Sequence, residues 1–224
     1  MRRRRFLACL VAPAIVAGCA PAERVWAPEE AVARARYVHD GPPAITLYTM
    51  INNRNGQGSH TSLMVNGSQR VIFDPAGSVT HELIPERNDV LYGITPAFED
   101  VYRRAHARET FHVVVQEVEV PAATAEMALR LVQERGPVAP TRCTRVTAEI
   151  ISSLPGFETV ERSWFPKRLM ESFGRVPGVR EEKLIEYDDP DKAKAIARYG
   201  QLPDPNRPAH FPMPTSTPPV GQVR

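Results

Sequence analysis

Cysteine is scarce in this chain, which has three in 224 residues. Cys9 and Cys19 fall within the first twenty residues, in a segment with the features of an export signal, so Cys143 is the one thiol left for the rest of the chain. A single thiol cannot form an intramolecular disulfide, which excludes the class of small extracellular domains held together by disulfides. The thiol of Cys143 is therefore either buried and inert or present for its reactivity.

A surplus of positive charge is also lacking. The chain has 28 Lys and Arg against 26 Asp and Glu, and four of the arginines are the consecutive residues Arg2–Arg5. Without them acidic residues slightly exceed basic ones, and a nucleic-acid-binding domain needs the opposite balance. His and Cys residues at the spacing of metal ligands are missing as well. We therefore expect no nucleic-acid partner, no metal and no cofactor.

The first 18 residues have the three parts of a bacterial export signal. Arg2–Arg5 form a basic start, about ten apolar residues follow, and Ala17 and Gly18 are small residues of the kind a signal peptidase accepts. The apolar run is too short for a membrane span, which needs about 20 residues. We expect a protein that works outside the cytoplasm.

The end of this segment, Val16-Ala17-Gly18-Cys19, resembles the lipobox of bacterial lipoproteins. The resemblance implies cleavage before Cys19, acylation of that cysteine with chains such as palmitate, and a lipid anchor in the cell envelope facing the periplasm. Ala20, which is not an aspartate, favours the outer membrane over the inner one. The run Arg3-Arg4-Arg5-Phe6-Leu7 also resembles the twin-arginine signal, so export by that route and by the general secretory route both remain open. An ordinary cleaved signal with a chance cysteine is the alternative.

Hydrophobic periodicity, prolines and glycines divide the chain into a signal (1–18), a tether with a short helix (19–40), a folded domain (41–199) and a proline-rich tail (200–224) that we expect to be extended or disordered. The mixture of helices and strands, with an early hairpin, indicates the α+β class: an antiparallel sheet with helices packed on it. Residues 78–93 are expected to be irregular. We expect helices at about 28–36, 95–108, 121–135, 142–154, 165–173 and 190–199, and strands at about 45–51, 60–65, 70–73, 111–120 and 183–187.

The clearest local pattern is a hairpin with an Asn66-Gly67 turn. His60 opens its first strand and Asp74 follows its second, so both lie at the same end. Side chains alternate between the two faces of a strand, and the register therefore decides whether these two share a face. A three-residue loop would place Asp74 opposite His60 and a two-residue loop would offset them by one, and both options stay open.

Cys143 is expected in the first turn of a helix capped by Thr141. At that position, backbone N–H groups without intrahelical partners and the helix dipole stabilise a thiolate, which is the reactive form of cysteine. The same N–H groups are potential donors to an oxyanion. A thiol here, a histidine on a strand and a carboxylate that orients the ring would form a nucleophilic triad of Cys143, His60 and Asp74.

The order of these residues resembles a known group of enzymes. The run His60-Thr61-Ser62-Leu63-Met64-Val65 in a hairpin precedes Cys143-Thr144-Arg145-Val146-Thr147 on a helix, over about residues 45–157. This is similar to the circularly permuted NlpC-type branch of papain-like enzymes, which includes lecithin retinol acyltransferase-like proteins. The resemblance implies His60 as the base, Cys143 as the nucleophile and Asp74 as the third member. It also implies an amide or ester hydrolase (a thiol protease or amidase) or an acyltransferase, with peptidoglycan peptides as the favoured substrate. Arg142 stands where the family has asparagine.

Each candidate residue also has a purely structural interpretation. Val146, Ile150 and Leu154 follow Cys143 at helical spacing, so the thiol could be part of the core. His60 could be a polar strand end, and Asp74 before Pro75 could be a turn former. His81 could replace Asp74 as third member. The other histidines are expected at surface or strand positions without partners; they are His39, His106, His112 and His210.

These structural interpretations lead to a second functional hypothesis. The chain could be a non-catalytic envelope lipoprotein that binds a partner or peptidoglycan, with the proline-rich tail as a docking segment.

Overall fold

The computed structural model describes residues 24–77, 79–186 and 191–201. The expected signal, the lipidation site Cys19 and most of the proline-rich tail, including His210, lie outside these residues. The helices are α1 (Glu29–Ala35), α2 (Pro96–His106), α3 (Ala122–Glu134), α4 (Cys143–Ser152), α5 (Pro166–Phe173) and α6 (Lys192–Tyr199). The strands are β1 (Ala44–Asn52), β2 (Gly58–Asn66), β3 (Arg70–Phe73), β4 (Glu86–Arg87), β5 (Val90–Tyr92), β6 (Phe111–Glu119) and β7 (Arg180–Leu184).

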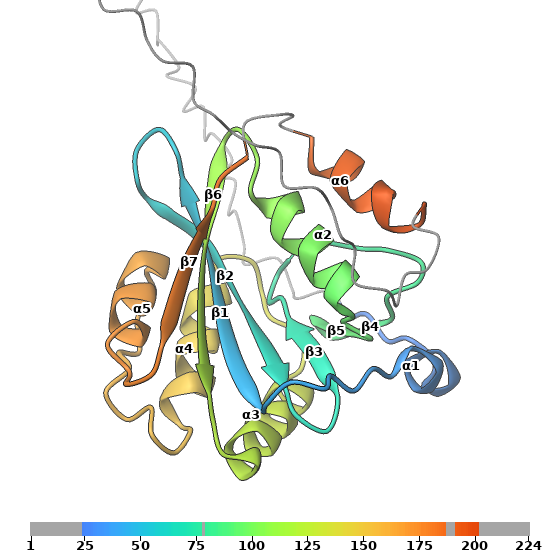
Figure 1. Ribbon diagram of the computed structural model, residues 1–224, viewed down its shortest axis with the longest axis horizontal. Helices are drawn as coiled ribbons and strands as arrows, with labels where there is room; N and C mark the ends of the chain where they lie inside the picture. The colour runs from blue at the N-terminus through green and yellow to red at the C-terminus, as the bar shows by residue number, and fades with distance from the viewer. Residues whose placement is uncertain (1–23, 78, 187–190, 202–224) are drawn as a thin grey trace, which may run out of the picture.

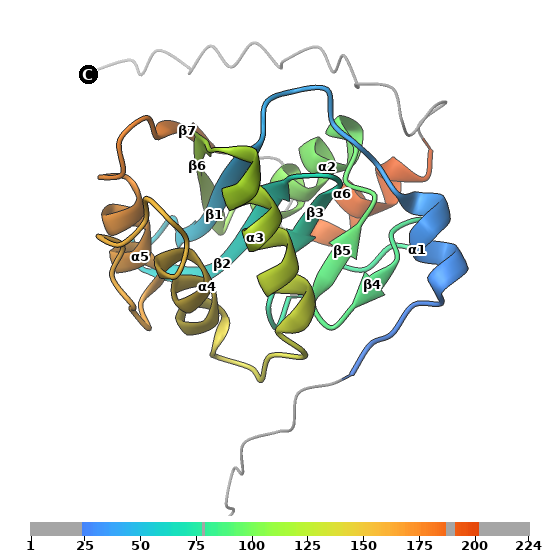
Figure 2. The same cartoon turned by 90° about the horizontal axis from the view of Figure 1, so that it is seen from below.

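The strands form one antiparallel sheet in the order β4-β5-β3-β2-β1-β6-β7, with helices packed on both of its faces (Figure 1). This confirms the predicted α+β class. Helices α3, α4 and α5 cover one face, and α2 and α6 cover the other (Figures 1 and 2). None of the helices in the described residues is long and apolar enough to cross a membrane.

Alternation along the strands divides the core into two apolar clusters. On β1, Ile45 and Leu47 belong to the cluster beneath α3, α4 and α5, whereas Tyr48 and Met50 belong to the cluster beneath α2. All of these side chains are buried. The central strands are therefore apolar on both faces, and this explains why β1 reads as an almost continuous hydrophobic run.

The start of α2 follows the predicted capping pattern. The Thr95 hydroxyl accepts a hydrogen bond from the Phe98 N–H at 3.2 Å, and Pro96 occupies the first turn, where its missing N–H costs nothing. This cap fixes the direction in which α2 crosses the sheet.

The expectation of an irregular segment over residues 78–93 was wrong. Strands β4 and β5 form a hairpin there, with Arg87 paired with Val90, so the loop is the two residues Asn88 and Asp89. Both have positive φ, 45° and 68°, as the tight turns of such hairpins require. The final strand was predicted at about 183–187 but lies at Arg180–Leu184.

The hairpin of β2 and β3 has the three-residue loop of one alternative but not the register that was expected from it. Asn66 pairs with Arg70, so the loop is residues 67–69 and begins one position later than expected. The last pair is Leu63 with Phe73. Continued by one step, this register places Asp74 beside Ser62 rather than opposite His60. Since His60 and Ser62 are two residues apart, all three side chains still share one face.

Candidate functional site

The site lies at an edge that the early end of β3 leaves open. Strand β2 continues from Ser62 back to Gly58 beyond its last pair with β3. The start of α4 packs at this edge. The Thr61 and Thr144 hydroxyls are 3.4 Å apart, and the Thr61 backbone helps to lower the pKa of the Cys143 thiol. These contacts bring the thiol beside the strand that carries His60.

His60 and Asp74 form a direct pair. The Nε2 atom of His60 lies 2.6 Å from Oδ1 of Asp74, whose side chain is 3% exposed. Tyr102 of α2 donates to the Ser62 hydroxyl at 2.7 Å, and its hydroxyl also helps to lower the pKa of the Asp74 carboxyl. Gly77 packs so closely on this carboxylate that a Cβ atom at residue 77 would collide with it. The carboxylate is therefore held on the imidazole from several sides.

Cys143 meets the same imidazole. The His60 ring is the group that most lowers the pKa of the thiol, and because Nε2 is taken by Asp74, Nδ1 is the nitrogen left to face the sulfur. The structure thus brings together Cys143, His60 and Asp74, the three residues chosen from the sequence. Cys143 is also buried, with 9% of its surface exposed, as the interpretation of this thiol as a core residue predicted.

The charges of the site reinforce one another. Burial raises the pKa of the Cys143 thiol, but the hydrogen bond and the charge of His60 outweigh it and lower that pKa to about 7. Burial also disfavours the charged His60 ring, but the bonds to Asp74 and Cys143 raise the pKa of His60 to about 10. Burial disfavours the Asp74 carboxylate, yet its bond to His60 lowers the pKa of that carboxyl. Between about pH 7 and pH 10 the site therefore holds a thiolate and an imidazolium.

The start of α4 differs from the prediction of a Thr141 cap. The helix begins at Cys143, its N-cap residue is Arg142, and no side chain caps it. Thr141 has a φ of 71°, which is strained for a β-branched residue and costs about 1–3 kcal/mol. The first N–H groups of a helix have no intrahelical acceptor, and Cys143 is the first residue of α4. Its backbone N–H lies next to its own sulfur, where a carbonyl oxygen under attack would need a hydrogen-bond donor.

His106, the last residue of α2, is a site residue that the sequence-based predictions did not include. It was expected to lack a partner, but its ring packs against His60, with centroids 6.3 Å apart and an angle of 17° between the planes. Its Nδ1 lies 2.9 Å from the Tyr102 carbonyl oxygen, and this nitrogen therefore carries the proton. Burial is the main cause that lowers the pKa of His106 to about 4, so the ring is neutral beside the charged His60. Helical spacing could have found it, because Phe98, Tyr102 and His106 follow at intervals of four.

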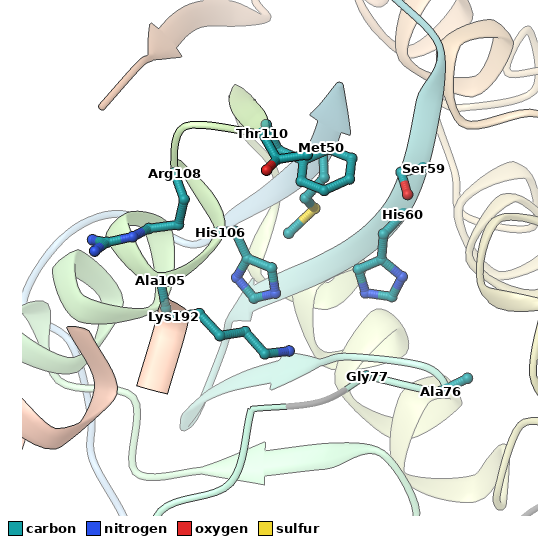
Figure 3. A pocket seen from close by; sticks show the side chains of 11 residues that line it. Met50, Ser59, His60, Ala76, Gly77, Ala105, His106, Arg108, Thr110 and Lys192 are labelled. Atoms are coloured by element: carbon teal, nitrogen blue, oxygen red, sulfur yellow. The ribbon is translucent and has the colours of Figure 1, made fainter. Parts of the chain in front are cut away.

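A cavity of about 220 Å³ opens beside these two rings (Figure 3). His60 and His106 line one part of it, and Lys192 of α6 extends between His106 and Gly77. Apolar side chains, including Met50 and Phe111, line another part.

The other histidines that the structure describes lie away from the triad. His81 packs edge-on against Tyr199 at 5.2 Å and does not replace Asp74. His39 and His112, expected to lack partners, lie within hydrogen-bonding distance of Tyr37 and Asn53. In the described part of the chain, no group of three or more His, Cys, Asp or Glu side chains could hold a metal ion.

Comparison with known proteins found no match for this chain: no family model, no curated protein and no solved structure. The function is therefore proposed from the geometry of the site.

Proposed function

We propose that the protein is a cysteine-dependent hydrolase or acyltransferase that acts on an amide or ester, with Cys143 as nucleophile, His60 as base and Asp74 as the residue that orients the ring. The observation that carries this proposal is the position of His60, whose imidazole bonds to the Asp74 carboxylate at 2.6 Å and lowers the pKa of the Cys143 thiol. A buried cysteine that served packing alone would need neither a charged partner nor a strained helix start.

The reaction follows from this arrangement. His60 takes the proton of the Cys143 thiol, and the thiolate attacks the carbonyl carbon of the substrate. The backbone N–H of Cys143 is positioned to donate to the oxyanion. When the tetrahedral intermediate collapses, the bond to the leaving group breaks and His60 returns the proton to that group. Water or another acceptor then gives its proton to His60 and attacks the thioester, which frees the sulfur.

We also propose a circularly permuted, NlpC-like and papain-like architecture for residues 41–199, because a histidine strand that precedes the cysteine helix follows the order of that group. The same resemblance suggests peptidoglycan peptides as substrates. A lipid anchor at Cys19 would place the site in the cell envelope facing the periplasm, with the outer membrane favoured. If Cys19 is acylated, the variant Cys19→Ser loses the incorporation of labelled palmitate, whereas persistent labelling contradicts the anchor.

The pH dependence of alkylation tests the proposed nucleophile. Iodoacetamide should modify Cys143 with a rate that rises to half its maximum near pH 7, about 1.5 units below an ordinary thiol. The variant Cys143→Ser serves as the blank. A midpoint near the ordinary value, or no modification of the folded protein, would favour the alternative function, a non-catalytic envelope lipoprotein that binds a partner or peptidoglycan.

A further inference from the structure

Two large aromatic side chains lie next to each other on the surface at the start of α5. Trp164 is 51% exposed and Phe165 is 62% exposed, and no large hydrophobic side chain of the described residues is more exposed than Phe165. A turn holds them there, because the buried Ser163 hydroxyl accepts the Phe165 N–H at 3.0 Å and Pro166 begins the helix. Adjacent exposed rings of this size are typical of a surface that another molecule covers.

The start of α5 is fixed to the end of β2 that carries His60. A Cβ atom at Gly58, two residues before His60, would lie 2.6 Å from the Cβ of Pro166, so a larger residue would push the helix away. Helices α4 and α5 lie next to each other on this face of the sheet (Figures 1 and 2). The Arg145 guanidinium of α4 lies over the Trp164 ring, 5.7 Å from its centroid. The rings therefore belong to a firmly packed part of the fold.

Positive charges flank the two rings along the chain. Arg162 precedes the aromatic pair, Lys167 and Arg168 follow it, and all three are exposed. The Arg162 Nε donates to the Ser152 hydroxyl at 2.9 Å, and the Arg168 guanidinium lies over the Phe165 ring, 5.5 Å from its centroid. Within the described ranges, none of these three cations forms an ion pair with a carboxylate. Their charges are therefore not compensated by the protein.

The acidic side chains nearby do not cancel this charge. Glu149 pairs with Arg145 at 2.6 Å, and Glu161 pairs with Arg175 at 3.0 Å. Glu171 is the single acidic residue of α5. Exposed aromatic rings among uncompensated cations match the interface of an anionic bilayer, where Trp and Phe enter the headgroup region and Lys and Arg attract the phosphates. The cations favour this occupant over a neutral one.

We propose that the exposed start of α5 is a docking surface for a bilayer of anionic phospholipids, made of Trp164, Phe165, Arg162, Lys167 and Arg168. Because α5 packs on the end of β2, docking turns the edge of the sheet that carries His60 toward the lipid. The inference goes beyond the proposed function and requires neither a reactive thiol at Cys143 nor acylation at Cys19.

The chain has two tryptophans, which allows a test specific to this surface. In the full chain, Cys19→Ser prevents a lipid anchor and Trp26→Phe leaves Trp164 as the fluorescent reporter. Phosphatidylglycerol vesicles should shift Trp164 emission to shorter wavelength, and brominated acyl chains in these vesicles should quench it. Phosphatidylcholine vesicles should do neither. Emission that phosphatidylglycerol leaves unchanged, or an equal response to the two lipids, would overturn the proposal.

Charge variants distinguish this surface from the net charge of the chain. Lys167→Gln combined with Arg168→Gln should weaken docking about 30-fold, so that Trp164 loses most of its quenching. The control combines Arg130→Gln and Arg135→Gln, two exposed cations of α3 and its C-cap, and should keep the quenching. Phe165→Ser, which changes no charge, should weaken docking about tenfold. Equal losses in the two double variants would overturn the surface, whatever the alkylation of Cys143 shows.

Discussion

Leu47 and Tyr48 are neighbours on β1, and both are fully buried, but they enter two different environments. Leu47 points into the cluster beneath α3, α4 and α5, where the buried polar side chains, such as Thr61 and Thr144, are uncharged. Tyr48 points beneath α2, where its hydroxyl donates to Glu99 at 2.9 Å and Glu99 pairs with Arg70. The nucleophile comes from the apolar side and the groups that control its charge lie on the polar side.

This division has a physical reason. A helix that must hold its first turn at a fixed position benefits from close apolar packing, which leaves it few alternative arrangements. A histidine that must stay charged donates from both ring nitrogens and needs acceptors around it, such as a carboxylate, and these require a polar environment whose groups are satisfied. The sheet separates the packing around the cysteine helix from the polar groups around His60. The two sides come together at the end of β2 that β3 leaves open.

The largest expected effect follows from removing the group that links the two sides. In His60→Ala, the Cys143 thiol loses the partner that lowers its pKa, and turnover of an ester substrate should fall about 10³-fold or more. The midpoint of alkylation should move from near pH 7 toward an ordinary thiol value. The control His112→Ala, a histidine of β6 outside the site, should change neither. An unchanged alkylation profile in His60→Ala would mean that the two sides are not coupled through this ring.

A substitution on the apolar side should change stability and leave the chemistry alone. Leu47→Ala creates a cavity in a fully buried cluster and should lower the free energy of unfolding by about 2–5 kcal/mol.

Tyr48→Phe keeps the ring and removes a hydrogen bond to a carboxylate, which should cost about 1.5–3 kcal/mol. Urea unfolding gives both values. If Tyr48→Phe cost more than Leu47→Ala, the polar side would be the main source of stability.

Loss of the orienting carboxylate should reduce activity less than loss of the ring. Asp74→Asn removes a charge that raises the pKa of His60, so the imidazolium should lose its proton at a lower pH. The alkaline limb of the pH–rate profile should therefore shift toward neutral pH, and turnover should fall about 10²-fold. A profile identical to that of the unchanged protein would assign Asp74 to the turn before Pro75 instead.

The smallest effect concerns His106 and the acid side of the stability curve. Its pKa in the folded state is about 4, below the ordinary 6.5, so the unfolded chain binds more protons between these values. Stability should therefore be lost as the pH falls from about 6.5 toward 4. In His106→Gln this loss should be smaller by about 2.5 kcal/mol, as measured by urea unfolding at a series of pH values. An equal loss in both proteins would place the acid sensitivity elsewhere.

The parts of the site that local patterns specify could be predicted. The hairpin brought His60 and Asp74 to one end, and the alternation of side chains placed them on one face although the loop starts one residue later than expected. The position of Cys143 at a helix start follows from the apolar spacing of Val146 and Ile150. Contact between the thiol and the ring could only be inferred from a resemblance, because it depends on how α4 packs against β2.

Other features have signals that are weak or contradictory. The two-residue turn at Asn88 and Asp89 is compatible with a tight hairpin, but β4 and β5 are too short to produce a periodic pattern. Strand β7 consists mainly of charged and exposed residues and pairs through its backbone at the sheet edge, so its sequence lacks strand alternation. His106 could have been recognised as a buried residue, but its partner belongs to another element.

The end of β3 at Phe73 has a consequence for how this site could be switched off. Two further residues of regular pairing would carry β3 past Ser62 and onto the backbone of Thr61, which now serves the sulfur of Cys143. The helix carrying the nucleophile would then be pushed away from the imidazole, although every residue of the triad would still be present. The length of β3 therefore determines whether the site can form. If this strand became longer, a descendant of the chain could keep the fold and lose the proposed activity.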